Sequence, residues 1–479
     1  MKIRVIGGGL AGPEAALTAA RLGCQVDLYE MRTLVDGKPR LTPAHQTTDF
    51  GELVCSNSLK SEAPFTAPWL LKQEMRRAGS ALLRFADETA VPAGHALAVD
   101  RLEFSRRISA AIQAEPRIRV IREEVTTLDQ TPPHGHDGTC CTIIATGPLT
   151  SNALSREIER LTGSGHLAFY DSISHIVDAD SIDMSRVYFA ARWDKGTADY
   201  INCPMDRAQY DRFYDALVAA EAAESRDWEN LEYFEGCLPI EVLARRGRDT
   251  LRFGPMKPVG LRDPRTGKTP WAVVQLRKEN LRADSYNLVG FQNHLRFGEQ
   301  AQVLRLIPGL EDARFLRYGQ IHRNTYICAP ALLDPCLRLA PKSSPLQSVP
   351  GRGPEEVPAH RSAQQVILFA GQISGVEGYT ESIATGLLAG IYAAAIAHGR
   401  QPVPVPRPTA LGSLVHYITH ADCKGFQPAN ITFDLLEPLE EELRRKIRDK
   451  KERHRLQCER SLAAFAAWQA QLHLDDAGS

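Results

Sequence analysis

The stretch KIRVIGGGLAGPEAALTAARLGCQVDLYE, Lys2 to Glu30, decides the fold. It consists of an apolar strand, a glycine turn, an alanine-rich helix and a second strand that ends in an acid. The spacing Gly7-x-Gly9-x-x-Gly12 allows a tight turn, a close approach of the backbone to a pyrophosphate, and close packing of the helix on the strand. The helix N-terminus would hold the anion, and Glu30 would accept a hydrogen bond from a ribose hydroxyl. The stretch therefore predicts a Rossmann-type dinucleotide site, with a glycine turn in an unrelated α/β protein as the alternative.

Two later segments favour FAD as the dinucleotide. CTIIATGP, Cys141 to Pro148, resembles the strand that closes an FAD domain in two-dinucleotide flavoproteins. VILFAGQISGVEGYTESIATGLLAG contains an apolar strand, Val366 to Ala370, then a glycine turn and a helix from about Tyr379. That helix would point a second N-terminus at the cofactor, where it would stabilise a reduced, anionic flavin. The alternative is simply one more βα unit of the sheet.

The predicted fold class is therefore α/β, with a discontinuous Rossmann-type FAD-binding domain, an inserted smaller α+β domain and a helical C-terminal segment. We expect the FAD domain to comprise residues 1–154 and 321–400, the inserted domain residues 155–320, and the helical segment residues 401–479, as one long helix or two. Residues 341–362 are rich in Pro, Ser and Gly and lack periodicity, so they are predicted to form a flexible surface loop without an assigned function.

Composition gives no sign of a nucleic-acid or membrane partner. The 479 residues include 57 basic and 58 acidic side chains, a formal net charge of −1, so a basic surface must come from local clustering. The longest apolar stretch, Ile383 to Ala397, includes two glycines and is shorter than the roughly 20 residues of a membrane span. Because the chain opens on a strand-like segment without a signal-peptide pattern, we expect a cytoplasmic protein without membrane contact.

Ten cysteines occur without C-x-x-C spacing, so no zinc site or dithiol motif is predicted. Cys55 in GELVCSNSLK and Cys237 in YFEGCLPIEVLARRG stand out, because both lie in irregular, Gly- or Pro-containing segments. A flavin enzyme can use a single thiolate to attack an electron-poor ring, and cations such as Arg245, Arg246 and Arg248 raise a thiolate fraction. Two ordinary core cysteines remain the alternative.

The chain resembles the TrmFO family of folate- and FAD-dependent tRNA (uracil-5-)-methyltransferases. The matching segments run in order from Met1 to about Leu436. They are VIGGGLAGPEAA, LYEMR, TPAHQTTDFGELVCSNSLKS, VPAGHALAVDR, YFEGCLPIEVLARRGRDTLRFGPMKPVGL, GQIHRNTYI, FAGQISGVEGYTESIATGLLAG and TALGSLVHYITHADCKGFQPANITFDLL. ELVCSNS and FEGCLPIE are quite specific to this family. The stretch 341–362 looks like an insertion relative to it, and the extreme C-terminus matches loosely.

The resemblance implies methylation of carbon 5 of the T-loop uridine of tRNA, with 5,10-methylenetetrahydrofolate as carbon donor and FAD reduced by NADH or NADPH. It implies that Cys237 is the nucleophile that adds to carbon 6 of uracil, and that Cys55 is the partner thiol and base. Since both roles need a thiolate, the two could be exchanged. The target base should flip out of the folded tRNA. No obligatory protein partner is expected.

The residues expected to hold FAD come from the two glycine turns and the segments that face them. They are Gly7, Gly8, Gly9, Leu10, Ala11, Gly12, Glu30, Gly147, Gly371, Gly375, Glu377 and Gly378. Arg245, Arg246, Arg248 and Arg252 are candidates to hold RNA phosphates, with a solvated helix face as the alternative. His294 is a candidate to cover the folate or flavin ring, although a lone histidine is more often structural.

The C-terminal segment carries a dense basic cluster. Its members are Arg444, Arg445, Lys446, Arg448, Lys450, Lys451, Arg453 and Arg455. The cluster could form a stripe along the tRNA backbone. Five acids interleave with it, however, and a salt-bridged helix face is the commoner meaning of such a pattern.

Four other functions compete with the tRNA methyltransferase. The same chemistry could act on a ribosomal RNA uridine, which the sequence does not exclude. The related MnmG family modifies the wobble uridine, but it needs a partner GTPase and has a different C-terminal region. A pyridine-nucleotide oxidoreductase would predict a second complete G-x-G-x-x-G, which the sequence lacks. A non-catalytic FAD protein that binds RNA would survive loss of both cysteines.

Overall fold

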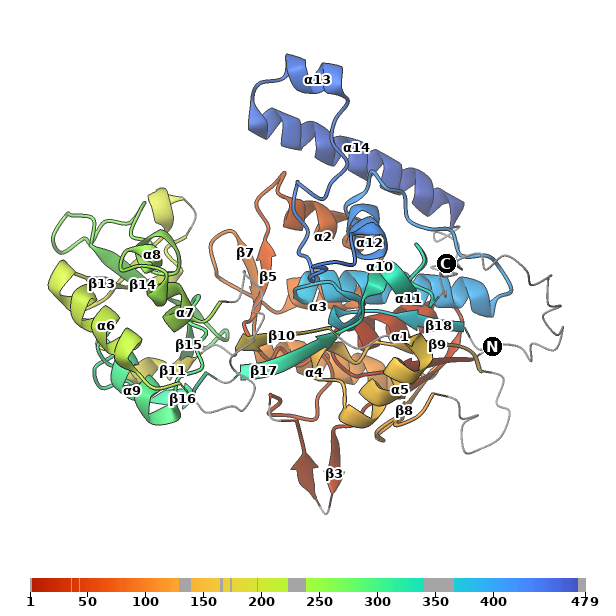
Figure 1. The fold of residues 1–479 in the computed structure, drawn as a ribbon, viewed down its shortest axis with the longest axis horizontal. Helices are drawn as coiled ribbons and strands as arrows, with labels where there is room; N and C mark the ends of the chain where they lie inside the picture. Colours follow the sequence, from red (N-terminus) through yellow and green to blue (C-terminus); the bar gives the residue numbers. More distant parts are fainter. Residues whose placement is uncertain are drawn as a thin grey trace, which may run out of the picture.

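The computed structural model describes residues 2–35, 37–42, 44–128, 139–163, 167–172, 175–195, 197–222, 238–319, 321–339 and 366–472. Figure 1 shows two bodies of unequal size, with the C-terminal helices across the larger one. The predicted nucleophile Cys237 and the predicted loop 341–362 lie outside the described residues.

A parallel sheet forms the centre of the larger body. Its order is β18 (Val366–Phe369), β9 (Thr139–Ile144), β1 (Lys2–Ile6), β2 (Gln25–Tyr29) and β8 (Ile118–Ile121). Successive positions of β1 and β2 are buried, including the charged Arg4 and Asp27, so both faces of the sheet are covered. β1 pairs with β2 in the register Lys2 to Gln25 through Ile6 to Tyr29, so the glycine turn and Glu30 follow at the same edge. The predicted α/β class is confirmed.

Two helices that follow strands of this sheet cross in close contact. α1 (Ala11–Arg21) comes after β1, and α11 (Tyr379–Ala397) comes after β18. A Cβ added at Gly386 would lie 2.4 Å from the Ala11 carbonyl oxygen, and one at Gly390 would lie 2.8 Å from that of Ala15. Among the described residues, α11 is the one helix long and apolar enough to cross a membrane, but 83% of its apolar window is buried inside the protein. Its glycines and burial fit a core helix.

An antiparallel sheet with its own apolar core forms the smaller body. Its order is β12 (Tyr188–Ala190), β13 (Tyr200–Met205), β14 (Ala272–Lys278), β15 (Ser285–Leu288), β11 (Ile176–Asp178) and β16 (Phe315–Arg317). The helices of this part are α6 (Arg207–Ala219), α7 (Ile240–Arg245), α8 (Thr250–Phe253) and α9 (Phe297–Leu304). A two-stranded ribbon of β10 (Leu167–Ser172) and β17 (Ile321–Tyr326) lies between the two bodies in Figure 1, where the chain leaves and returns.

Shorter elements surround the parallel sheet. The strands are β3 (Thr33–Val35) with β4 (Lys38–Arg40), and β5 (Ser58–Ser61) and β6 (Ala90–Val91) on either side of β7 (Ala96–Val99). The helices are α2 (Ala67–Arg77), α3 (Ala81–Glu88), α4 (Arg101–Ala114), α5 (Asn152–Thr162), α10 (Ala329–Leu332) and α12 (Ala410–His420).

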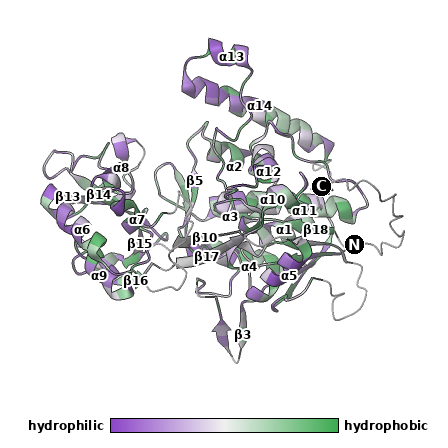
Figure 2. Ribbon diagram, viewed as in Figure 1, coloured by the Kyte–Doolittle hydropathy of each residue, from purple (hydrophilic) through white to green (hydrophobic). Residues whose placement is uncertain are grey.

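The end of the chain folds as two helices rather than one. α13 (Glu441–Lys446) and α14 (Lys450–Gln471) are separated by a short turn. Figure 2 shows α13 and the start of α14 as hydrophilic, in contrast to the apolar α11. The last turns of α14 bury Phe465 and Trp468 in the same apolar core as the parallel sheet. One end of α14 is therefore anchored, while its first turns are polar.

Buried carboxylates tie helices to one another. Glu74 of α2 accepts hydrogen bonds from the backbone N–H groups of Ala410 and Leu411, both at 2.9 Å, and from the Ser461 hydroxyl at 2.6 Å. Burial raises the pKa of Glu74 to about 7, against the lowering effect of these donors. This single side chain thus joins α2, the start of α12 and the middle of α14.

Candidate functional site

A pocket opens at the carboxyl edge of the parallel sheet. It encloses about 970 Å³, including the part open to solvent. Eight of the predicted FAD residues line it: Gly7, Gly8, Gly9, Leu10, Ala11, Glu30, Gly147 and Gly371. Tyr379 and Ser382 of α11 also line it, so the beginnings of both helices meet the same space. The two glycine turns, whose first glycines Gly7 and Gly371 are 364 residues apart in sequence, are therefore brought together.

The glycines of the first turn have separate tasks. A Cβ added at Gly9 would meet no atom within 4 Å, whereas one at Gly12 would lie 1.8 Å from the Gly7 carbonyl oxygen. Gly12 therefore serves packing, and Gly9 leaves open space in the pocket wall. No side chain caps the start of α1 after Leu10, so its first N–H groups remain available to an anion. Open space beside an uncapped helix start fits a dinucleotide pyrophosphate.

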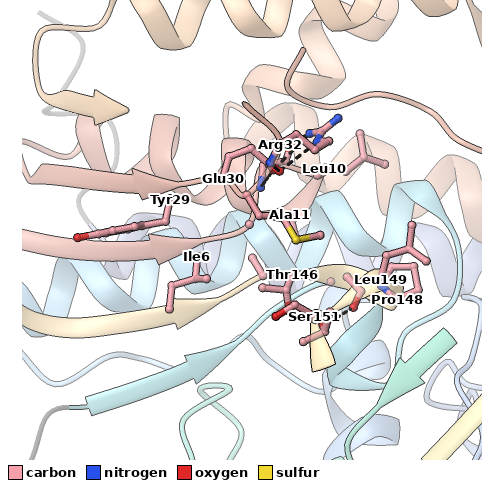
Figure 3. Close-up of a pocket in the computed structure, with 18 of the residues that line it drawn as sticks. Ile6, Leu10, Ala11, Tyr29, Glu30, Arg32, Thr146, Pro148, Leu149 and Ser151 are labelled. Carbon is pink, nitrogen blue, oxygen red and sulfur yellow. Dashed lines mark hydrogen bonds and ion pairs between the residues drawn. The ribbon is translucent and has the colours of Figure 1, made fainter. Parts of the chain in front are cut away.

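The acid at the end of β2 is held by a neighbouring arginine. Glu30 accepts a hydrogen bond from Gly8 N at 2.7 Å and pairs with Arg32 Nε at 3.0 Å. Burial alone would raise the pKa of Glu30, but the charge and hydrogen bonds of Arg32 hold it below its usual range. Figure 3 shows this pair on one side of the pocket and Thr146, Pro148, Leu149 and Ser151 on the other. Glu30 is therefore an ionised acceptor at the pocket wall.

The loop that carries Cys55 docks on the first glycine turn. Gly51 N donates to the Gly8 carbonyl oxygen at 3.0 Å. Gly51 has φ +67°, and a Cβ there would lie 2.4 Å from Ile108, so the position requires glycine. Further along the loop, Cys55 N donates to the Tyr379 hydroxyl at 2.7 Å. Tyr379 and Val54 line the pocket, whereas the half-buried Cys55 is not among the lining residues.

A buried arginine fixes this loop from behind. Arg101 at the start of α4 donates through Nη2 to the Cys55 carbonyl oxygen at 3.1 Å, and through Nη1 to that of Leu53. Its Nε pairs with Glu279 Oε2 at 2.9 Å, and Glu279 also accepts from Asn287 at 2.6 Å. Glu279 follows β14 of the smaller body. The network therefore joins the Cys55 loop to the antiparallel sheet through the backbone of Leu53 and Cys55.

Three predicted FAD residues of the second turn support the pocket from outside its lining. A Cβ at Gly375 would lie 2.5 Å from Phe426, and Gly378 is crowded in the same way. Both have positive φ, at +89° and +106°, which favours glycine. Glu377 accepts a hydrogen bond from the amide of Gln372 at 2.6 Å, and Gln372 does line the pocket.

The predicted phosphate-binding arginines differ in how they are engaged. Arg248 pairs with Asp211 at 2.9 Å and with a second acid of α6. Arg252 pairs with the residue three positions before it. Arg245 and Arg246, at the end of α7, are exposed. Because Arg248 and Arg252 already form ion pairs within the protein, they are weaker candidates for RNA contacts than the exposed Arg245.

The predicted ring-covering histidine is buried in the smaller body. His294 is 6% exposed, and its Nδ1 lies 2.6 Å from Oε1 of Glu241, which belongs to α7. His294 does not line the pocket at the parallel sheet. Glu241 comes four positions after Cys237, so the pair supports the helix that follows that cysteine.

Sequence reasoning did not single out four residues that contact the pocket or the Cys55 loop: Arg32, Glu52, Arg101 and Tyr379. Arg32, Glu52 and Tyr379 line the pocket. Glu52 accepts from Gln46 N at 2.8 Å and so shapes the adjoining loop. All four lie inside the segments that carry the family resemblance, and only this resemblance pointed to them in the sequence. Their partners are too distant in sequence to be inferred from spacing.

Solved structures share the fold. The structure of Aquifex aeolicus GidA in the form II crystal covers 99% of this chain and 74% of its own, with a TM-score of 0.66 and 17% identity. The form I crystal of the same protein gives a TM-score of 0.65. At this identity the likeness concerns the fold alone.

Sequence relatives are much closer. Residues 2–344 and 360–401 match the family described as Glucose inhibited division protein A. A Koribacter versatilis protein named methylenetetrahydrofolate–tRNA-(uracil-5-)-methyltransferase TrmFO is 63% identical over 98% of both chains. Proteins of the same name from Solibacter usitatus and Bacillus cytotoxicus are 58% and 48% identical over 97% and 96% of this chain. The chain therefore belongs to the TrmFO family, within the wider family of glucose inhibited division protein A.

Proposed function

We propose that this protein methylates carbon 5 of the T-loop uridine of tRNA, with 5,10-methylenetetrahydrofolate as carbon donor and FAD as cofactor. The relatives' names support the tRNA uracil as substrate and the folate as donor. The single observation that carries the proposal is the docking of the Cys55 loop on the glycine turn, which brings Glu52 and Val54 of that loop into the wall of the pocket expected to hold FAD.

The pocket residues fit FAD. The N–H groups at the start of α1 and the open space at Gly9 would receive the pyrophosphate, and Glu30 would face the ribose. The beginning of α11, with Gly371 beside it, would face the flavin end. Once bound, FAD would carry the one-carbon unit from the folate to the uracil and supply the hydride, after reduction by NADH or NADPH.

The protein's own chemistry would come from two thiols. Carbon 5 of uracil is a poor nucleophile until a thiolate adds to carbon 6 and makes carbon 5 enolate-like. We assign this addition to Cys237. A base must then remove the proton from carbon 5 before the thiolate leaves carbon 6, and we assign this step to Cys55. The buried Arg101 guanidinium, which interacts electrostatically with Cys55 and donates to its carbonyl oxygen, holds the Cys55 segment in place.

The test is methyl transfer to an unmodified tRNA transcript with methylenetetrahydrofolate, NADPH or NADH, and the FAD-loaded protein. The parent is compared with Cys55→Ala and Cys237→Ala. Cys203→Ala is the matched control, because Cys203 is fully buried in β13 and burial raises the pKa of its thiol. We expect 5-methyluridine in the T loop from the parent and from the control, and none from the other two variants.

Each other outcome removes a defined part of the proposal. Product with ribosomal RNA and none with tRNA would keep the chemistry and replace the substrate. Full activity in both cysteine variants would eliminate the thiol mechanism. Loss of methyl transfer in Cys237→Ala alone would keep Cys237 as the nucleophile and would require a base other than Cys55.

A further inference from the structure

Six of the basic residues of the last two helices fall into two groups. Arg445, Lys446 and Arg455 form ion pairs with acids three or four positions away on their own helices. The commoner interpretation of the sequence pattern, a salt-bridged helix face, is confirmed for these three. Their charges are used within the protein.

The second group faces a hollow. Arg444 of α13 and Lys450 and Arg453 of α14 line a space of about 770 Å³, open in part to solvent, against residues 433–439. Within the ranges that the structure describes, none of these three side chains has an ion pair. Asp434 is the one acid among the lining residues, so the hollow carries an excess of two positive charges. We call this space the C-terminal hollow.

His454 lines the C-terminal hollow beside these cations. The His454 ring stacks on Phe433, with centroids 3.6 Å apart and planes 9° apart. Partial burial, together with the charges of Lys450 and Arg453, holds the pKa of His454 below its usual range, although Asp434 acts in the opposite direction. Lys450 and Arg453 therefore both act electrostatically on a ring that lines the C-terminal hollow.

We propose that the C-terminal hollow binds a phosphate of the RNA backbone; this inference rests on the proposed function, which makes RNA the substrate. Arg and Lys without internal partners are the groups that contact phosphates and position a nucleic acid without reading its sequence. Arg448 and Lys451, which are exposed in and beside the turn between the two helices, extend the basic surface beyond the hollow. An extended polyanion can engage both parts, whereas a free phosphate can fill only the hollow.

The test uses the full-length, FAD-loaded protein and measures tRNA affinity at several KCl concentrations. The double variant Lys450→Gln/Arg453→Gln removes two charges from the hollow, and Arg445→Gln/Lys446→Gln removes two paired charges nearby. We expect the first variant to bind tRNA about tenfold more weakly, with the slope of log affinity against log salt reduced by about 1 to 2. The control should stay within about twofold of the parent. KM for tRNA should rise in the hollow variant while kcat is unchanged.

Binding and turnover separate the two proposals. Equal affinities and salt slopes for the parent and both variants would overturn the hollow proposal while leaving methylation untouched. If the parent binds tRNA with the predicted variant effects but transfers no methyl group, the proposed function fails and the hollow remains an RNA site. Inorganic phosphate at about 10 mM could raise the melting temperature of the parent while tRNA affinity is the same in all variants. In that case the hollow holds a free anion and the RNA proposal is wrong.

Discussion

The pocket predicts opposite consequences for two glycines only three positions apart. At Gly9 an added Cβ meets nothing within 4 Å, and no positive φ restricts the position, so Gly9→Ala should fold normally. Its methyl group would instead occupy the space where a pyrophosphate approaches the backbone. Losing one charge-assisted hydrogen bond costs about 1.5–3 kcal/mol. FAD should therefore bind roughly 10- to 100-fold more weakly.

Gly12→Ala should act on the fold itself. Its Cβ would lie 1.8 Å from the Gly7 carbonyl oxygen, and ordinary contact begins at 3.4 Å. Because the obstacle is backbone, α1 must move away from the turn, which costs at least about 1–3 kcal/mol by analogy with overpacked cores. The free energy of unfolding should fall without FAD as well as with it.

The assay is flavin binding by fluorescence titration, together with thermal unfolding of the FAD-free and FAD-loaded proteins. Gly9→Ala should match the parent without FAD and lose most of the stabilisation that FAD adds. Gly12→Ala should unfold at lower temperature in both states. If Gly9→Ala binds FAD as tightly as the parent, the pyrophosphate does not approach this turn and the assignment of the pocket is wrong.

Two further predictions concern buried charges. Because the pKa of Glu74 is raised to about 7, the stability that this carboxyl contributes is present below about pH 4.5 and is lost as the pH rises through 7. The melting temperature of the parent should therefore fall between these pH values. Glu74→Gln, which cannot ionise, should show a smaller fall. Glu279→Gln would leave the charge of Arg101 buried and uncompensated, so the free energy of unfolding, measured in urea, should fall by about 3–5 kcal/mol. The control Glu103→Gln removes an exposed ion pair of α4 and should lower it by at most about 1 kcal/mol. A similar loss in both variants would contradict the role of the Arg101 network.

The local features of the sequence were enough to predict the centre of the fold. Strand, glycine turn and helix follow from residues that are neighbours in the chain, and α11 begins at Tyr379 as the glycine pattern indicated. The closing strand, Thr139–Ile144, and the later one, Val366–Phe369, pair directly, which their apolar composition could not reveal. Periodicity predicts elements, but it does not order strands.

The supporting contacts of the site depend on long-range packing. Arg101 and Glu279 are 178 residues apart, so no spacing rule links them. The basic cluster was ambiguous for a different reason. The helix breaks after Lys446, and this break decides which charged residues belong to the same helix. Only residues three or four positions apart on one helix lie side by side and can pair. The roles of Cys55 and Cys237 remain predictions, since Cys237 lies outside the described residues.

The most direct test of the account follows the transferred carbon. The FAD-loaded protein is incubated with NADPH, methylenetetrahydrofolate labelled in its methylene carbon, and either an unmodified tRNA or the same tRNA with cytidine in place of the T-loop uridine. Label is expected in 5-methyluridine of the first tRNA and in no nucleotide of the second. Label at another uridine would contradict the T-loop assignment, and NADPH oxidation without label in any RNA would contradict the methyltransferase function itself.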